Sequence, residues 1–392
     1  MEIMINNQNK EKLSLLKTYF RENTLKFDDT IIFPHENFDK IVNYDFHKIN
    51  LPEEYGGQNL NISDMSHMLI ELASGCSSTT LCLAMHYYTL GAIKNVIGYK
   101  DKLADILEEI CINGQFIGSI GDPNALLYGS IEKIASSINI TSVRTKGGYY
   151  ISGIKHFVSG SPRIRYLPVY CKLENSAEIT AIIVDMNSEG VTIDTNWKYS
   201  SLKSTLTNSV YFNKVFVPES NIIGREKHGI EDTKDFIYWF RLALVSVYQG
   251  IAQATYDYIL DFIKTKKDLA TNKTLAFLPT IQQSLAELRI HLEVSNTFIK
   301  SCCLQADEEN KQGSFTDELY NNTLIAKQYV SETVNKIVWI AMQIQGNNSL
   351  NSGNILEKLY RDVRAVTFHP PSEYLLKEVL AKRSLGVINL RR

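Results

Sequence analysis

Residues 148–160 read Gly-Tyr-Tyr-Ile-Ser-Gly-Ile-Lys-His-Phe-Val-Ser-Gly, and this stretch decides the expected fold. Aromatic and β-branched side chains are frequent in it, and a glycine stands at each end. Such a run, bounded by turn-forming residues, is typical of a strand that ends in a tight turn. The stretch therefore predicts a sheet in the middle of the chain.

Further β-rich runs lie on both sides of this stretch, between Phe116 and Gly224. They read SVRTK, YLPVYCKL, ITAIIVDM, GVTIDTNW and SVYFNKVFVP, and turn formers such as Asn187 to Gly190 separate them. Short strands divided by turns are typical of an antiparallel sandwich or barrel. We therefore expect a small antiparallel β domain over 116–224.

Helical periodicity fills the rest of the chain. Apolar residues recur at three- and four-residue steps before residue 115, and longer helices are predicted near 232–267, 279–309, 317–345, 354–367 and 372–385. The helix over 317–345 has both end signals, because it follows Thr316 with two acidic residues in its first turn and stops at Gly346. Long helices with short links predict a bundle.

The expected fold class is thus α+β, with three domains. These are an N-terminal helical domain (1–115), a middle β domain (116–224) and a C-terminal helical bundle (225–392), and no internal repeat is seen. A chain of 392 residues is long enough to bury a large core without disulfides.

Charge and cysteine usage restrict the class of protein. The 41 basic and 43 acidic side chains leave a net charge of −2, so no global field favours nucleic acid or an anionic membrane. The six cysteines form no CxxC pair and no zinc-like spacing with histidine, which predicts reduced cysteines and no metal site. No export signal or membrane span is recognisable, so a cytoplasmic location is expected.

The stretch 148–160 resembles the "G-x-Y-x-I-x-G-x-K-x-W-I-T-N" strand and turn of the acyl-CoA dehydrogenase superfamily. Other segments are similar to that family in the same order: Leu51 to Gly57, Ser209 to Gly224, Gln343 to Asn347 and Glu357 to Asp362. The resemblance covers nearly the whole chain. It implies a helical domain, a β domain and a four-helix bundle, with a flavin cofactor.

The resemblance also implies cofactor contacts. Phe157 and Ser159 would lie against the flavin ring, and Ile120 and Gly121 would belong to the loop near its pyrophosphate. A segment with Gln343, Gly346 and Asn347 would reach the cofactor of a neighbouring subunit, which implies a homodimer or homotetramer. A strand with a flat apolar residue and a hydroxyl can supply the wall and donor that a flavin ring needs. The alternative is a core phenylalanine and a turn serine.

The sequence departs from the family in the cofactor loops. The family's "T-E-P-G-A-G-S-D" loop is represented by residues 121–128, where Leu126 and Leu127 replace the glycine and serine. The family's "R-x-x-F-G" is replaced by Lys264 to Leu278, which contains no arginine, and Asn347 replaces a glycine. These changes indicate a loosely held cofactor, either FAD or FMN.

A second departure concerns the catalytic base. Family dehydrogenases remove an α-proton with a Glu after the last helix, and counting from Arg361-Asp362 places Pro370 at that position. A subset keeps the Glu before an arginine in the first bundle helix, where this chain has Phe240. Loss of a general base is worth about 10²- to 10⁴-fold in rate.

Two histidines and a serine suggest another chemistry. His86, Ser159 and His369 resemble a trio in the flavin-dependent monooxygenases of the superfamily, the dibenzothiophene-monooxygenase-like branch, and could donate protons near dioxygen. The alternatives are a helix-packing role for His86 and an N-cap-like role for His369.

Three functions remain open. The first is an oxygenase that takes reduced flavin, with a flavin reductase as a possible partner, and acts on a small organic substrate. The second is an acyl-CoA dehydrogenase or oxidase with a non-standard base, and the third is a non-catalytic flavin binder. Cys302-Cys303 is expected to pack in a helix, and Arg361, Asp362 and Arg364 are expected to form structural ion pairs.

Overall fold

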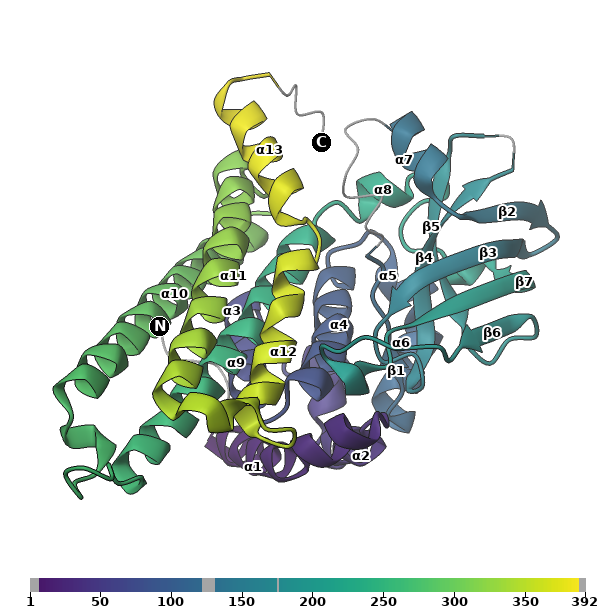
Figure 1. Ribbon diagram of the computed structural model, residues 1–392. Coiled ribbons are helices and arrows are strands. Elements are labelled where there is room, and N and C mark those ends of the chain that lie inside the picture. Colours follow the sequence, from purple (N-terminus) through teal and green to yellow (C-terminus); the bar gives the residue numbers. More distant parts are fainter. Residues whose placement is uncertain (1–6, 122–130, 175, 388–392) are drawn as a thin grey trace.

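Both ends of the chain are helical, and the middle of the chain forms a sheet, which Figure 1 shows at the right-hand side of the molecule. The computed structural model describes residues 7–121, 131–174 and 176–387. The N-terminal helices are α1 (Asn7–Thr30), α2 (His35–Asn43), α3 (Ile62–Ala73), α4 (Ser77–Ile93), α5 (Tyr99–Lys102) and α6 (Ala104–Asn113). The C-terminal helices are α8 (Gly229–Asp232), α9 (Phe236–Thr265), α10 (Pro279–Lys311), α11 (Asp317–Gln345), α12 (Ile355–Phe368) and α13 (Glu373–Ser384).

The sheet contains β1 (Phe116–Ile117), β2 (Ile140–Thr145), β3 (Gly148–Val158), β4 (Ile164–Leu173), β6 (Val191–Asp194) and β7 (Asn208–Pro218). Its order is β1-β4-β2-β3-β7-β6, and β5 (Ile179–Asp185) pairs with β4. Short helix α7 (Ile131–Ser137) precedes β2. The prediction of a purely antiparallel domain is corrected here, because β4 pairs in parallel with β1 and β2. The chain reverses into β3 and again into β4, so β2 and β4 run in the same direction.

The strongest end signals of the sequence become helix caps. The Thr316 side chain accepts a hydrogen bond from the Leu319 N–H, and Gly346 ends α11 with a φ of 75°. At the start of α3, the Asn61 side chain accepts a bond from the Asp64 N–H at 2.8 Å. Local polar groups therefore supply these caps, and at the start of α3 the Asp307 carboxylate of α10 also accepts from the Ile62 and Ser63 N–H groups.

The N-terminal helices and the bundle share one core. Helices α3 and α4 pack on α9, and every residue of α4 is buried. Close approach requires glycine at two crossings: a Cβ on Gly91 would lie 2.2 Å from the Trp239 ring, and one on Gly250 would lie 2.5 Å from the Ile70 carbonyl oxygen. This packing joins helices on both sides of residue 225, where the C-terminal bundle was predicted to begin. The division into three domains therefore stays a prediction.

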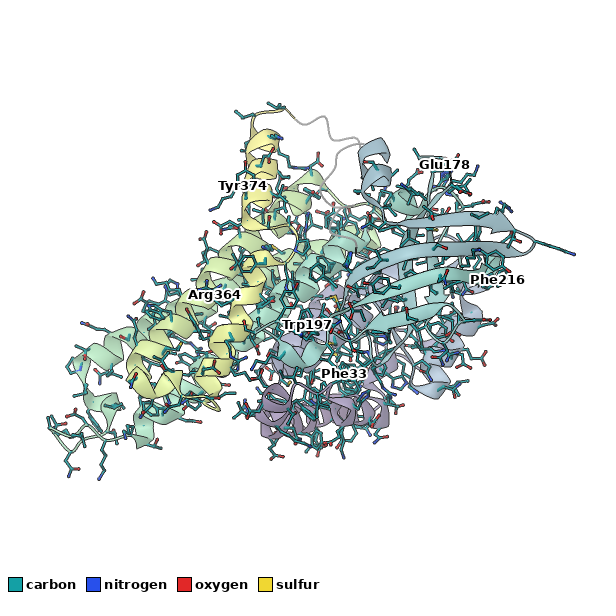
Figure 2. The ribbon with its side chains drawn as sticks, turned by 45° about the vertical axis from the view of Figure 1, so that its right-hand side comes forward. Phe33, Glu178, Trp197, Phe216, Arg364 and Tyr374 are labelled. Atoms are coloured by element: carbon teal, nitrogen blue, oxygen red, sulfur yellow. The ribbon has the colours of Figure 1, made fainter. Side chains whose placement is uncertain are left out.

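Ion pairs fix α12 to the N-terminal helices. Arg361 pairs with Asp28 of α1 at 2.6 Å and with Glu357, and Lys358 pairs with Asp362 inside the core. Arg364 lies on the exposed face of α12 (Figure 2), with its guanidinium 5.8 Å from the Tyr360 ring. Arg361 and Asp362 thus have structural partners, as expected from the sequence. All six cysteines are unpaired, and Cys302 and Cys303 are buried in α10.

Within the described ranges, none of the helices combines the length and apolar character required to cross a bilayer.

Candidate active site

The end of β3 presents an aromatic face that a cofactor could use. Phe157 is 56% exposed and has a left-handed φ of 58°, which turns its ring out of the strand. Tyr199, whose ring centroid lies 6.5 Å from that of Phe157, stacks on Trp197 at 4.2 Å. Trp197 lies on the β6–β7 connection between the sheet and the bundle (Figure 2). Phe157 was predicted from the sequence, whereas the two aromatic residues beside it were not.

A tight turn brings Ser159 next to this aromatic face. Gly160 has a φ of 75°, and its backbone N–H donates to the Thr205 carbonyl oxygen at 2.9 Å. A Cβ at Gly160 would lie 3.2 Å from the Cβ of Cys82, so the turn packs closely on α4. The glycine that closes the diagnostic stretch is therefore needed for both the turn and the contact.

A chain of hydroxyl groups orients Ser159. The Thr207 hydroxyl donates to Ser159 Oγ at 3.0 Å and lies 2.8 Å from the hydroxyl of Thr205, which donates to the Leu202 carbonyl oxygen. Since Ser159 Oγ accepts from Thr207, its own proton can be donated to a ligand. Thr207 was missed in the sequence because a threonine in an S-T-L-T run carries no signal of its partner.

The segment after β1 is held from two sides. The Gly121 N–H donates to Tyr88 Oη at 3.1 Å and to Ser119 Oγ at 3.0 Å. The buried Lys155 donates to the carbonyl oxygens of Ile120 and Gly121 at 3.1 and 3.0 Å. The two residues predicted to approach the cofactor are thus fixed through their backbones. Leu126 and Leu127, on which the prediction of a loose cofactor depends, lie outside the described residues.

His86 is enclosed by backbone groups. Its Nδ1 accepts from the Ile117 N–H at 3.1 Å, so Nε2 carries the proton and donates to the His47 carbonyl oxygen at 2.6 Å. Burial lowers the pKa of His86 to about 3, which keeps it neutral. This geometry speaks against the expected catalytic role, because neither nitrogen is free to contact a ligand. His86 fits the packing alternative.

His369 follows α12 and faces α9. The hydroxyl of Tyr248, which is buried in α9, is hydrogen-bonded to His369 Nδ1 at 2.8 Å. Burial, with a smaller contribution from the charge of Lys327, lowers the pKa of His369 to about 4. The imidazole is therefore neutral at pH 7 and carries one proton, on Nδ1 or on Nε2. Tyr248 was not predicted, because nothing in the sequence shows which face of α9 meets the loop after α12.

Both positions of the family's base lack a carboxylate. Pro370 follows His369, and Phe240 packs edge-on against Tyr88 with ring centroids 5.3 Å apart. Tyr88 in turn contacts Gly121, so Phe240 is adjacent to the predicted cofactor loop. Aromatic and aliphatic rings thus replace the ionisable groups in this part of the site.

Gln343, Gly346 and Asn347 lie elsewhere in the protomer. They are exposed at the end of α11, which Figure 1 shows on the side of the bundle away from the sheet. One protomer therefore does not bring them together with Phe157 and Ser159. Their predicted contact with a cofactor requires a second subunit.

Comparisons with known proteins identify the architecture. The family model for the acyl-CoA dehydrogenase N-terminal domain matches residues 14–108, and that for the C-terminal domain matches residues 227–385. The chain is 25% identical to a 3-(aryl)acrylate reductase of Clostridium sporogenes, with 91% of this chain and 92% of the relative covered. It is 24% identical to a benzylmalonyl-CoA dehydrogenase of Aromatoleum aromaticum, with 91% of each covered.

A solved structure confirms the predicted fold class. The FMN-bound form of TdsC, a dibenzothiophene monooxygenase from Paenibacillus sp. A11-2, superposes with a TM-score of 0.87. The match covers 97% of this chain and 98% of that one, at 18% sequence identity. At this identity the likeness concerns the fold alone.

Proposed function

We propose that this chain, which belongs to the acyl-CoA dehydrogenase superfamily, is an oxygenase that uses reduced flavin and dioxygen on a small organic substrate. One observation carries the choice of reaction: the loop after α12 presents the neutral imidazole of His369 directly beside Pro370, the position where the resembled dehydrogenases have a carboxylate. An imidazole with a pKa of about 4 is a weak base at neutral pH, whereas its N–H group can donate. The site therefore favours chemistry that needs a donor over chemistry that needs an α-proton removed.

Family membership supports the expected enzyme class, a flavin-dependent oxidoreductase with FAD or FMN. The residues present fit such a cofactor, because Phe157 offers an exposed aromatic face and Ser159 has a proton to donate. When bound, the flavin would supply the electrons that activate dioxygen. Phe157 would form the apolar wall for its ring, and the backbone held by Lys155 would line its polar edge.

In the proposed site, His369 and Ser159 would donate hydrogen bonds from two different sides. Tyr248 would donate to His369 Nδ1, so that the imidazole proton would lie on Nε2, the nitrogen that does not contact Tyr248. Ser159 is held by Thr207 and donates from the sheet side. Phe240 and Pro370 are apolar and would help to exclude bulk water, whose access would favour oxidation of reduced flavin by dioxygen to give oxidised flavin and hydrogen peroxide without oxygenation of the substrate.

Oxygen consumption tests this function. The protein supplied with reduced FMN or FAD and a substrate should convert dioxygen into oxygenated product and water, with little hydrogen peroxide. In His369→Ala we expect product to fall about 10²-fold or more, since a positioned hydrogen-bond donor is lost, while hydrogen peroxide rises in proportion. His228→Ala is the matched control, because His228 is largely exposed before α8.

The result that would contradict the oxygenase is unchanged product and peroxide in His369→Ala. A protein that binds flavin but consumes no oxygen with any supplied substrate would support the third function, a non-catalytic flavin binder. The benzylmalonyl-CoA dehydrogenase relative favours the second function, an acyl-CoA dehydrogenase with a non-standard base. That alternative predicts rapid reduction of the flavin by an acyl-CoA in the absence of oxygen, whereas the oxygenase does not.

We also propose a homodimer or homotetramer. The exposed Gln343, Gly346 and Asn347 lie too far from the β3 face to serve the same site within one protomer. Sedimentation at micromolar concentration should therefore show an assembly of at least two chains. A monomer that still holds flavin stoichiometrically would rule this proposal out.

A further inference from the structure

Lys327 is a buried cation without a partner. It lies in the middle of α11 with 0% of its surface exposed, and its Nζ has no hydrogen-bond partner among the described residues. No described carboxylate forms an ion pair with it; the carboxylate that acts on it electrostatically, Glu373 of α13, already pairs with Lys377 at 2.6 Å. An unpaired ammonium inside a protein is strongly unfavourable. Its presence therefore needs an explanation.

A second buried cation lies on the facing helix. Arg241 of α9 donates to the hydroxyls of Thr323 and Tyr320 at 3.2 and 3.3 Å, and its guanidinium lies 4.5 Å from the Tyr320 ring centroid. Its Nε has no partner, and no carboxylate of the described chain pairs with it. Two buried positive charges thus share this interface without a described counter-charge.

Helix geometry places Lys327 between Arg241 and His369. Helices α9 and α11 run in the same direction, because α10 reverses the chain between them (Figure 1). Thr323 is level with Arg241, and Lys327 lies one turn, or about 6 Å, further along. Tyr248, which holds His369, lies two turns beyond Arg241 on the same face of α9. The charge of Lys327 accordingly acts on the imidazole of His369.

We propose that Lys327 and Arg241 bind the anionic group of the substrate, and that the substrate is a monoanionic organic acid of the carboxylate class. This inference rests on the proposed function, since it names the substrate of the same site. A carboxylate would accept from Lys327 Nζ and offset the buried charge, and a charge-assisted bond of this kind is roughly twice as strong as a neutral one. The organic part of the substrate would then extend toward His369.

A monoanion fits better than a dianion. Arg241 already donates from both terminal nitrogens to Thr323 and Tyr320, which leaves its Nε and the Lys327 Nζ as the two nitrogens without a partner among the described residues. Two donors can serve the two oxygens of one carboxylate. A phosphate dianion has more acceptors and a larger hydration free energy than these groups can replace.

Binding to the flavin-free protein tests the inference without any turnover. Acetate, butyrate and benzoate should each raise the melting temperature of the protein by a few degrees at saturation, while acetamide, butyramide and benzamide should not. Inorganic phosphate at equal ionic strength is the comparison for a dianion site. In Lys327→Met the dissociation constant of the best carboxylate should weaken at least tenfold, with the amide unchanged.

The matched control is Lys311→Met, because Lys311 lies exposed at the end of α10. Lys327→Met should fold with an unchanged or higher melting temperature, since it removes an unpaired buried charge. The inference is overturned if carboxylates and amides stabilise the native protein equally, if phosphate alone stabilises it, or if Lys327→Met keeps the preference. Carboxylate binding that is followed by no oxygenation would count against the proposed function and leave the anion site intact.

The pH dependence gives an independent check. Burial lowers the pKa of Lys327 to about 8; the charge of Glu373 on α13 acts against this shift, and that of Arg241 on α9 acts with it. His369, after α12, is neutral above its pKa of about 4 and does not titrate in the tested range. Benzoate affinity should therefore be constant near pH 6 and fall as pH rises through 8 to 9. An affinity that rises over this range would contradict the role of Lys327.

Discussion

Anaerobic mixing with a saturated acyl-CoA is expected to leave the bound flavin oxidised. Bleaching should be slower by about 10²- to 10⁴-fold than in an enzyme of this fold that retains its carboxylate base. The reason is local, because Pro370 and Phe240 occupy the two positions where that base would stand. Stopped-flow absorbance of the oxidised flavin measures the rate, and chemical reduction by dithionite serves as the control that the flavin can be reduced.

His369 makes this prediction falsifiable. If it served as the base, bleaching would be fast and would be lost in His369→Ala. Its pKa of about 4 adds a second criterion, since a base with this pKa is fully deprotonated at neutral pH. The rate would then fall only as pH drops toward 4 and would stay flat from 6 to 8. Fast bleaching with that profile would overturn the oxygenase and support the acyl-CoA dehydrogenase.

The fold was predictable where its signals are local. The ends of α11 follow from Thr316 and Gly346, whose caps involve only neighbouring residues. The strand over 148–158 likewise follows from its own side chains and flanking glycines. The parallel pairing of β4 with β2 was not predictable, because it depends on how two distant strands meet. Periodicity shows which residues form a strand but does not determine its neighbours.

The candidate site shows the same difference between residues with a local sequence signal and residues whose role depends on distant contacts. A motif placed Phe157 and Ser159 at the end of β3, since family motifs preserve a local turn. Lys327 and Tyr248 carried no such signal, because each is an ordinary helix residue until the facing helix is known. His86 illustrates the opposite case: its resemblance to a residue of the monooxygenase trio suggested catalysis, yet both of its nitrogens contact backbone groups. Only tertiary contacts distinguish a packing histidine from a catalytic one.

The ion pair of Lys358 with Asp362 connects the bundle to the segment around Leu202, which precedes the threonines that contact Ser159. Both side chains are buried, and Asp362 also accepts from the Ser77 hydroxyl at 2.6 Å and from the Leu202 N–H at 2.7 Å. Burial acts most strongly on the pKa of Lys358 and lowers it, but nearby negative groups, Asp362 foremost, together outweigh burial and the pKa is raised. Lys358 therefore stays charged at neutral pH, and its pair with Asp362 holds α4, α12 and the segment before Thr205 together.

Lys358→Met is expected to lower the free energy of unfolding by about 3–5 kcal/mol, because it leaves the Asp362 carboxylate buried without its counter-charge. Urea denaturation followed by far-UV circular dichroism measures the loss. The double variant Lys358→Met with Asp362→Asn removes both charges and keeps an oxygen for the Leu202 N–H, so it should lose less, about 1–2 kcal/mol. Lys382→Met, which breaks an exposed pair with Glu378, should change stability by no more than about 0.5 kcal/mol.

The order of these three losses decides the interpretation. If the double variant is as unstable as Lys358→Met, the loss comes from packing and the uncompensated charge is not its cause. If Lys358→Met is as stable as Lys382→Met, the buried pair contributes nothing to the free energy of folding. Since Thr205 and Thr207 lie on the segment that Asp362 anchors through Leu202, Lys358→Met should also loosen the hydroxyl chain to Ser159. Faster amide hydrogen exchange over residues 200–208 in Lys358→Met, but not in Lys382→Met, would be the direct sign of that connection.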